Sequence, residues 1–180
     1  MFPIKKTLNH PRANPEKRSM FCQTIEELRK DELPLVFIDE SGFAHDMPRT
    51  HGYSSKGQKC YGLQDWGAKG RTNVIGALCK GVLLTVTLLN GSVNTEVFNA
   101  WVDQDLIPKL PPKSVVIMDN ATFHKSPLIY EMLENAGHKL LYLPPYSPDL
   151  NPIEKKWAQA KKLRRKTGLS LEQLFLTTYL

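Results

Sequence analysis

Residues 144–154 read PPYSPDLNPIE, and this stretch sets how the rest of the chain must be arranged. Its prolines fix the backbone and keep the first part of the segment out of regular structure. A helix is then predicted to begin with Asn151 as its N-cap and Pro152 at its first position. This helix carries Glu154 in its first turn. The stretch therefore presents one carboxylate at the end of a rigid approach, and the rest of the chain must supply the groups it works with.

Length and composition fit one domain. The chain has 180 residues, of which 41% are hydrophobic and 23% are charged, enough for one core of ordinary size. No run approaches the ~18–20 apolar residues that span a bilayer, and no apolar segment typical of a signal peptide follows Lys5 and Lys6. Cys22, Cys60 and Cys79 form no CxxC pair, which predicts neither a disulfide framework nor a zinc site. We expect a reducing, cytoplasmic compartment.

Positive charge is concentrated in one segment. The net charge is +6, yet the residues outside 155–166 sum to about −1. A basic block of this kind indicates either a polyanion partner or a solvated helix face. The block holds no acid and seven cations, which are Lys155, Lys156, Lys161, Lys162, Arg164, Arg165 and Lys166.

Apolar runs of strand length predict five strands. Two of these runs flank Lys80-Gly81, a spacing typical of a β-hairpin with a tight turn. We expect a turn over residues 40–42 after the first strand, and a further short strand over residues 58–63. The five main strands are predicted over residues 33–39, 71–79, 82–89, 114–119 and 138–143.

Helical patterns separate the later strands. They cover residues 15–30, 94–106 and 126–137 and the segment after Asn151, with Asn94 and Ser126 as N-caps and Gly137 as a stop. A last short helix is predicted after Ser170, where Gln173 completes a capping box. Three antiparallel strands followed by βαβα crossovers predict an α/β fold with a mixed five-stranded sheet and helices on its faces.

Two apolar strands end in an aspartate, Asp39 and Asp119. Sites in α/β sheets form at the carboxyl ends of strands, so the two side chains would meet if these strands were neighbours. Adjacent carboxylates repel unless they share a proton or hold cations. Magnesium prefers oxygen ligands of this kind, and Glu154 is placed to supply a third.

Each acid also has a structural interpretation. Aspartates often close turns after strands, and Glu154 at the third helical position is where a capping-box glutamate belongs. Asp149 competes as the third carboxylate and Glu40 as the first, although Glu40 should point to the opposite face of its strand. His124 has either a helper role at the site or a hydrogen-bonding role in its loop. The remaining acids considered, which we expect to be solvated, are Asp46, Asp65, Asp103 and Asp105.

Four motifs together resemble a known family. They are FIDESGF (37–43), GYSSKGQ (52–58), IMDNATFH (117–124) and LPPYSPDLNPIEKKWAQAK (143–161), with 34 residues between Asp119 and Glu154. The chain resembles the DDE transposases of bacterial insertion sequences, in the bacterial branch of the mariner superfamily. There is no Walker-A, GxGxxG or GxSxG motif to favour another chemistry.

The resemblance implies a ribonuclease H-like fold in which Asp39, Asp119 and Glu154 are the catalytic, metal-binding acids. It implies that two Mg²⁺ or Mn²⁺ ions are bound, and that phosphoryl transfer cuts element ends and joins them to target DNA. It also implies a nucleoid-associated protein that works as a homodimer on paired ends. We expect Trp157 to pack against the sheet. The cations expected to contact DNA are Lys155, Lys156, Lys161, Lys162, Arg164 and Arg165.

The family usually carries helix-turn-helix domains before the catalytic domain. Here the first catalytic strand is predicted by residue 35, so we expect residues 1–32 to form a linker and helix, 33–166 the catalytic domain, and 167–180 a tail helix. A separate polypeptide carrying the helix-turn-helix domains is an expected partner. Two other functions stay open, namely a DNA-binding remnant without turnover and a ribonuclease H-like nuclease that acts on RNA–DNA hybrids.

Overall fold

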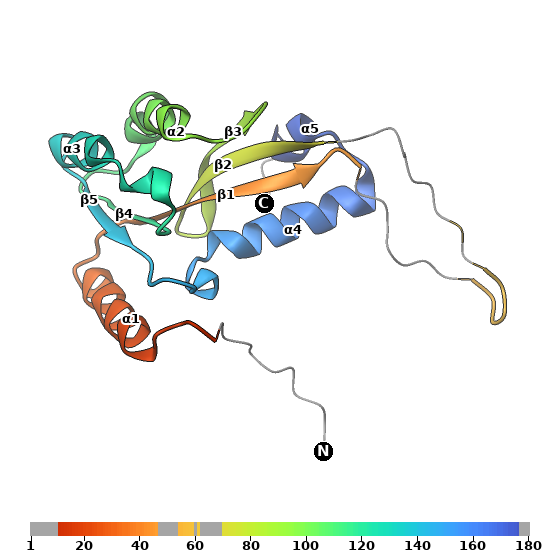
Figure 1. Cartoon of the computed structure of the whole chain (residues 1–180), viewed down its shortest axis with the longest axis horizontal. Helices are drawn as coiled ribbons and strands as arrows, with labels where there is room; N and C mark the ends of the chain where they lie inside the picture. Colours follow the sequence, from red (N-terminus) through yellow and green to blue (C-terminus); the bar gives the residue numbers. More distant parts are fainter. Residues whose placement is uncertain (1–10, 47–53, 60, 62–69, 177–180) are drawn as a thin grey trace, which may run out of the picture.

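A mixed five-stranded sheet forms the centre of the protein (Figure 1). The computed structural model describes residues 11–46, 54–59, 61 and 70–176. The strand order is β3-β2-β1-β4-β5, antiparallel between β1, β2 and β3 and parallel between β1, β4 and β5. This confirms the predicted α/β class. The strands are β1 (Leu35–Ala44), β2 (Arg71–Cys79), β3 (Val82–Leu89), β4 (Val115–Met118) and β5 (Lys139–Tyr142).

The hairpin of β2 and β3 has the predicted bounds. Its two turn residues, Lys80 and Gly81, have φ angles of 49° and 83°, which a two-residue turn between twisted strands requires. The turn predicted over residues 40–42 is wrong, because β1 continues to Ala44 while pairing with β2. Of the short strand predicted over 58–63, the described residues Gln58, Lys59 and Tyr61 are not in a strand, and the others lie outside the described part.

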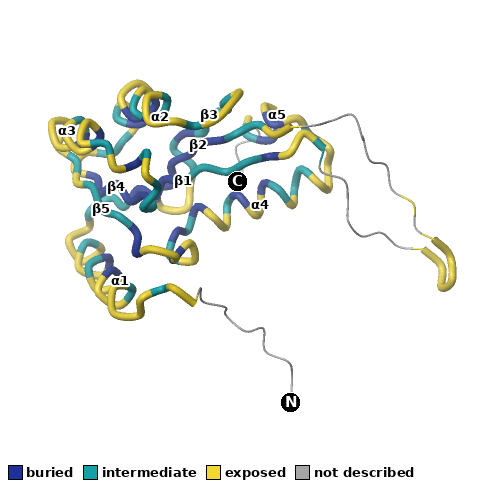
Figure 2. Tube along the Cα trace, viewed as in Figure 1, coloured by how far each residue is buried: buried dark blue, intermediate teal, exposed yellow. Residues whose placement is uncertain are grey.

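Helices cover both faces of the sheet. The alternation of side chains along β1 sends Phe37, Asp39 and Phe43 to one face and Val36 and Ile38 to the other. The first face packs against α1 (Pro15–Lys30), α4 (Ile153–Thr167) and α5 (Leu171–Leu176). The second packs against α2 (Thr95–Trp101) and α3 (Pro127–Asn135). Figure 2 shows the buried residues following the central strands between these layers. No helix in the described residues is long and apolar enough to cross a membrane.

The helix predicted over 94–106 changes type after its first two turns. Asn94 caps it as predicted, accepting the Val97 N–H at 2.9 Å, but α2 gives way to a π-helical segment, Val102–Leu106, and then to a 3₁₀ turn, Ile107–Lys109. The expectation that Asp105 is solvated is wrong. Its carboxylate accepts hydrogen bonds from Thr85 at 2.5 Å and Thr87 at 3.0 Å, which fastens the π-helical segment to β3.

The last helix begins as predicted. The N–H of Gln173 donates to the Ser170 hydroxyl at 3.2 Å, and the N–H of Ser170 donates to the Gln173 side chain at 3.2 Å. This reciprocal pair is a capping box. Leu171 and Leu174 of α5 are buried in the core beneath α4, so the tail helix packs onto the sheet.

Candidate active site

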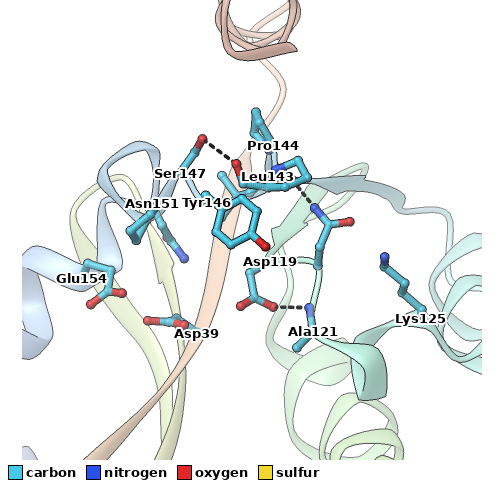
Figure 3. A pocket seen from close by; sticks show the side chains of 13 residues that line it. Asp39, Asp119, Ala121, Lys125, Leu143, Pro144, Tyr146, Ser147, Asn151 and Glu154 are labelled. Atoms are coloured by element: carbon cyan, nitrogen blue, oxygen red, sulfur yellow. Dashed lines mark hydrogen bonds between the residues drawn. The ribbon is translucent and has the colours of Figure 1, made fainter. Parts of the chain in front are cut away.

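A pocket of about 510 Å³ lies where β4 ends beside β1. The pairing of β1 with β4 reaches Phe37 and Ile117, so Asp39 lies beyond the last paired residue, next to the end of β4. Asp39, Asp119 and Glu154 all line the pocket, and Figure 3 shows their carboxylates directed into the same space. The structure therefore brings together the three acids that the sequence selected.

Asp39 is held by a buried indole. The Trp157 N–H donates to Oδ2 of Asp39 at 3.1 Å. Burial raises the pKa of Asp39 to about 8, and the neighbouring charges of Glu154, Glu40 and Asp119 add to this effect. A carboxylate in this position favours a proton or a cation beside it.

Trp157 fills the space between α4 and the sheet. It is 1% exposed, and the rings of Phe43 and Phe175 meet it edge-on at 6.3 and 6.2 Å between centroids. Its six-membered ring lies over Gly76, the residue paired with Asp39 across β1 and β2. This confirms the prediction that Trp157 packs against the sheet, and it adds the hydrogen bond to Asp39, which the sequence did not indicate.

Asp119 belongs to a second hydrogen-bonded group. Its Oδ1 accepts the Ala121 N–H at 2.8 Å and lies 2.6 Å from Nδ1 of His124. Nε2 of His124 lies 2.8 Å from Oε1 of Glu40, so the imidazole joins the two acids. The bond to His124 lowers the pKa of Asp119. Burial alone would lower the pKa of His124, but its bonds to Asp119 and Glu40 raise it to about 9.

These contacts bear on two of the open interpretations. His124 is fully buried and forms hydrogen bonds to Asp119 and Glu40, so it orients Asp119 from behind, and its role as a helper at the site stays a prediction. Glu40 points away from Asp39, as the strand alternation predicts, and is absent from the residues described as lining the pocket. Glu40 therefore does not replace Asp39 as the first acid.

We expect the free energy of unfolding of the metal-free protein to fall as pH rises from about 6.5 to about 9. The folded-state pKa of His124 is about 9 against an ordinary 6.5, so its charge stabilises the fold fully below pH 6.5 and the effect is lost as pH passes 9. The pKa of Asp39 is raised from 3.8 to about 8 in the folded state. Its ionisation therefore costs the folded state more than the unfolded one, and stability also falls as pH rises toward 8. Urea unfolding at a series of pH values measures the decline.

The Glu40→Gln variant tests the assignment to His124. Removing one of the two acids that hold the imidazolium proton should move the upper part of the decline to lower pH. Glu96→Gln, an exposed position on α2, is the matched control and should follow the wild type. A wild-type stability that is constant between pH 6.5 and 9 would contradict the prediction.

Glu154 enters the pocket from the first turn of α4. The predicted capping box is wrong, because α4 begins at Ile153 and Pro152 occupies the cap position. The side chain of Asn151 instead joins β1 to the start of α4. Its N–H donates to the carbonyl of Ile38 at 3.1 Å, and its Oδ1 accepts the Ile153 N–H at 3.4 Å. Burial raises the pKa of Glu154, with Lys161 opposing this and Asp119 adding to it. The side chain is thus directed to the pocket rather than to the helix end.

Asp149 is turned away from the pocket. Its two carboxylate oxygens accept hydrogen bonds from the guanidinium of Arg18 at 2.9 and 2.6 Å. This bidentate pair lowers the pKa of Asp149 and ties α1 to the loop that precedes α4. Asp149 therefore has a structural partner and does not compete with Glu154 as the third acid.

The basic residues of α4 occupy different environments. Lys155, Lys162 and Arg165 are exposed, whereas Lys156 is half-buried. Lys161 Nζ lies 5.3 Å from the Phe43 ring centroid. Arg164 donates to the backbone carbonyls of Ala44, His45 and Leu169, joining the end of β1 to the end of α4.

The pocket lining also includes a cation and an aromatic residue that the sequence did not single out. They are Lys125, which directly follows His124 in the motif, and Tyr146, which lies inside the proline-rich stretch. The available signal was the position of Tyr146 within one recognised motif and of Lys125 directly after another.

The carboxylates suit a hard cation in their chemistry. In the described part of the chain, no group of three or more His, Cys, Asp or Glu side chains is already arranged to hold a metal ion. All three pocket acids nevertheless offer oxygen donors, which magnesium and manganese prefer. Burial, with the neighbouring charges of Glu154 and Asp119 adding to it, raises the pKa of Asp39, and a bound cation would offset both effects. The residues present therefore fit a divalent metal.

The family comparison places this sheet and its acid-lined pocket in a known class of proteins. Residues 34–174 match the model of the DDE superfamily endonuclease family, so the chain belongs to that family. No curated protein sequence matches it.

Solved structures show which fold is shared. The chain is similar to the Mos1 strand transfer complex, with a TM-score of 0.76 and 18% identity over 98% of this chain and 56% of that chain. It is similar to the Mos1 mariner paired-end complex with Mg, with a TM-score of 0.69 and 19% identity over 89% of this chain and 53% of that chain. It is also similar to the Mos1 catalytic domain alone, with a TM-score of 0.60 and 15% identity over 95% of this chain and 80% of that chain. These matches confirm the ribonuclease H-like fold, and the chain spans about half the length of the transposase chains in the two complexes.

Proposed function

We propose that this chain is the catalytic domain of a transposase of bacterial insertion-sequence type, which cuts DNA and joins element ends to target DNA. The observation that carries the proposal is the meeting of Asp39, Asp119 and Glu154 around one pocket. Membership of the DDE endonuclease family supports it.

Asp39, Asp119 and Glu154 would hold two Mg²⁺ or Mn²⁺ ions. The oxygen donors and the raised pKa of Asp39 support this, as do Mos1 complexes described with Mn and with Mg. When bound by these acids, such ions would activate the attacking oxygen and stabilise the leaving one. The chain's own groups keep the acids oriented: the Trp157 N–H fixes Asp39, and the Ala121 N–H fixes Asp119.

A nicking assay tests this function. Supercoiled plasmid is incubated with the purified chain in magnesium, in manganese and in a chelator, and nicking is expected only with metal. The same assay includes duplex DNA and RNA–DNA hybrid oligonucleotides. Preference for the hybrid would indicate a ribonuclease H-like nuclease. Salt-sensitive DNA binding without cleavage in either metal would indicate a binding remnant.

The exposed cations of α4 extend outward from Glu154 and are proposed to meet DNA phosphates. Replacing Lys162 with Ala is expected to reduce the slope of log affinity against log salt concentration by about 0.9, because one phosphate contact is lost. Lys139→Ala is the matched control, since Lys139 is exposed at the start of β5, at the opposite end of the sheet. Fluorescence anisotropy with a short duplex measures both slopes. Equal slopes for the two variants would remove Lys162 from the interface.

Arg164 is expected to contribute both to the stability of the fold and to DNA binding. Because its guanidinium bonds three backbone carbonyls, its replacement should lower stability as well as binding. We propose Lys155, Lys156, Lys161 and Arg165 as further DNA contacts on this helix.

The assembly is also part of the proposal. We divide the chain into a linker and helix (1–32), a DDE catalytic domain (33–166) and a tail helix (167–180), working at the nucleoid as a homodimer on paired element ends. A separate polypeptide would supply helix-turn-helix domains. Support comes from Mos1 neighbours described as strand transfer and paired-end complexes, of which this chain covers 56% and 53%. Light scattering with and without element-end DNA tests the dimer.

A further inference from the structure

Tyr146 is an aromatic residue held in an unfavourable backbone conformation beside the pocket. It is 49% exposed, and its φ of 57° lies in the left-handed region that bulky residues rarely adopt. Among the described residues, the other non-glycine residues with positive φ are Glu32, Lys80 and Lys113, and they do not line the pocket. Backbone strain of this kind clusters at active sites and ligand clamps.

The loop around Tyr146 is fixed at both ends. Asn120 donates to the backbone where the loop leaves β5, and Asn151 donates to the backbone of β1 where the loop approaches α4. Between them, the Ser147 hydroxyl donates to the carbonyl of Pro145 at 3.2 Å. The backbone that carries Tyr146 is therefore tied to Asn120 and Ile38, the immediate neighbours of Asp119 and Asp39 in the chain.

The surroundings of Tyr146 fit a nucleotide. Figure 3 shows its ring beside the carboxylates, with Lys125 on the far side of Asp119. Lys125 carries the one positive charge among the described residues that line this pocket. An aromatic face and a cation that line one pocket match a base and a nearby phosphate, and aromatic stacking accepts any base.

We propose that Tyr146 is a stacking platform for a nucleobase next to the phosphodiester to be cut, and that Lys125 pairs with a neighbouring phosphate. This inference rests on the proposed DNA-cleaving function. Trp157 is buried beneath Asp39, so the stacking surface at this pocket falls to Tyr146. Because stacking is tolerant of base identity, the contact would grip both element ends and varied target sequences.

Photocross-linking tests the stacking. Short single-stranded and duplex oligonucleotides carrying 5-iodouracil are irradiated with the 180-residue chain in calcium, and the cross-linked residue is found by mass spectrometry. We expect a cross-link at Tyr146 and retention of affinity in Tyr146→Phe. Tyr146→Ala should lose the cross-link and bind about 5- to 150-fold more weakly, the range that one stacked base supplies. Tyr130→Ala is the matched control, because Tyr130 is 52% exposed on α3 and lies outside the pocket.

Two further variants separate the contributions. Tyr146→Gly relieves the positive φ, so it should be more stable than Tyr146→Ala and bind as weakly. Lys125→Ala should reduce the salt slope by about 0.9 and keep the Tyr146 cross-link.

The outcomes distinguish this inference from the proposed function. Suppose that the wild type nicks DNA, and that Tyr146→Ala binds DNA as tightly as Tyr130→Ala and gives the same amount of cross-linked product. The inference is then overturned and the proposed function stands. If no nicking occurs in either metal, the proposed catalysis fails, and a cross-link at Tyr146 would still support the stacking site.

Discussion

Replacing Asp119 with Asn is expected to reduce metal-dependent nicking by more than about 100-fold. Asparagine has nearly the same shape, and its side-chain carbonyl can still accept the Ala121 N–H, which Asp119 accepts at 2.8 Å. The substitution removes the negative charge and one oxygen donor from the pocket. Substituting groups that only orient metal ligands reduces activity by about 10- to 100-fold, so the loss of a ligand should be larger. Plasmid nicking in magnesium and in manganese measures the effect.

Asp103→Asn is the matched control for this substitution. Asp103 is exposed on the π-helical segment, so its variant should nick at the wild-type rate. Thermal unfolding of both variants checks that they are folded. Wild-type nicking by the Asp119→Asn protein in either metal would contradict the assignment of Asp119 to the catalytic set.

Gly76→Ala is expected to lower both stability and nicking. A Cβ at this position would lie 2.6 Å from Cη2 and 3.0 Å from Cζ2 of Trp157. The indole has no room to retreat, because Phe43 and Phe175 pack against it. Overpacking of this kind costs about 1–3 kcal/mol, and a displaced indole loses its bond to Asp39. We expect nicking to fall about 10- to 100-fold, as for other groups that orient metal ligands.

Two variants test this explanation. Gly42→Ala places a Cβ 3.1 Å from Cδ of Arg71, a flexible side chain that can move, so it should leave stability and nicking nearly unchanged. Combining Gly76→Ala with Trp157→Phe replaces the indole with a smaller ring. Stability, measured by urea unfolding, should then recover while nicking stays low, because the N–H donor to Asp39 is missing. Recovery of both would show that this donor is unimportant.

Much of the fold could be predicted because its signals are local. The hairpin turn at Lys80-Gly81 and the capping box of Ser170 and Gln173 depend on residues within three positions of one another in sequence. The predictions that failed depend on distant partners. β1 continues past Glu40 because β2 pairs with it, and Asp105 is bonded because β3 supplies two hydroxyls.

The candidate site divides in the same way. The acids could be selected because strand ends and the proline-rich stretch mark them in the sequence, and the structure places all three around one pocket; their catalytic roles stay a prediction. The indole bond to Asp39 could not be selected, since it joins residues that only packing of α4 on the sheet brings together. The same holds for Arg18 and Asp149, which link α1 to the loop before α4.

The parallel pairing of β1 with β4 also sets when the pocket can exist. It joins Phe37 to Ile117, about 80 positions along the chain, whereas β2 and β3 are joined by a two-residue turn. Closing the longer loop is slower because more chain entropy is lost before any contact forms. Until β4 pairs with β1, the strand ends that carry Asp39 and Asp119 are not held side by side. The pocket that gathers the three acids is therefore complete only after this distant pairing has formed.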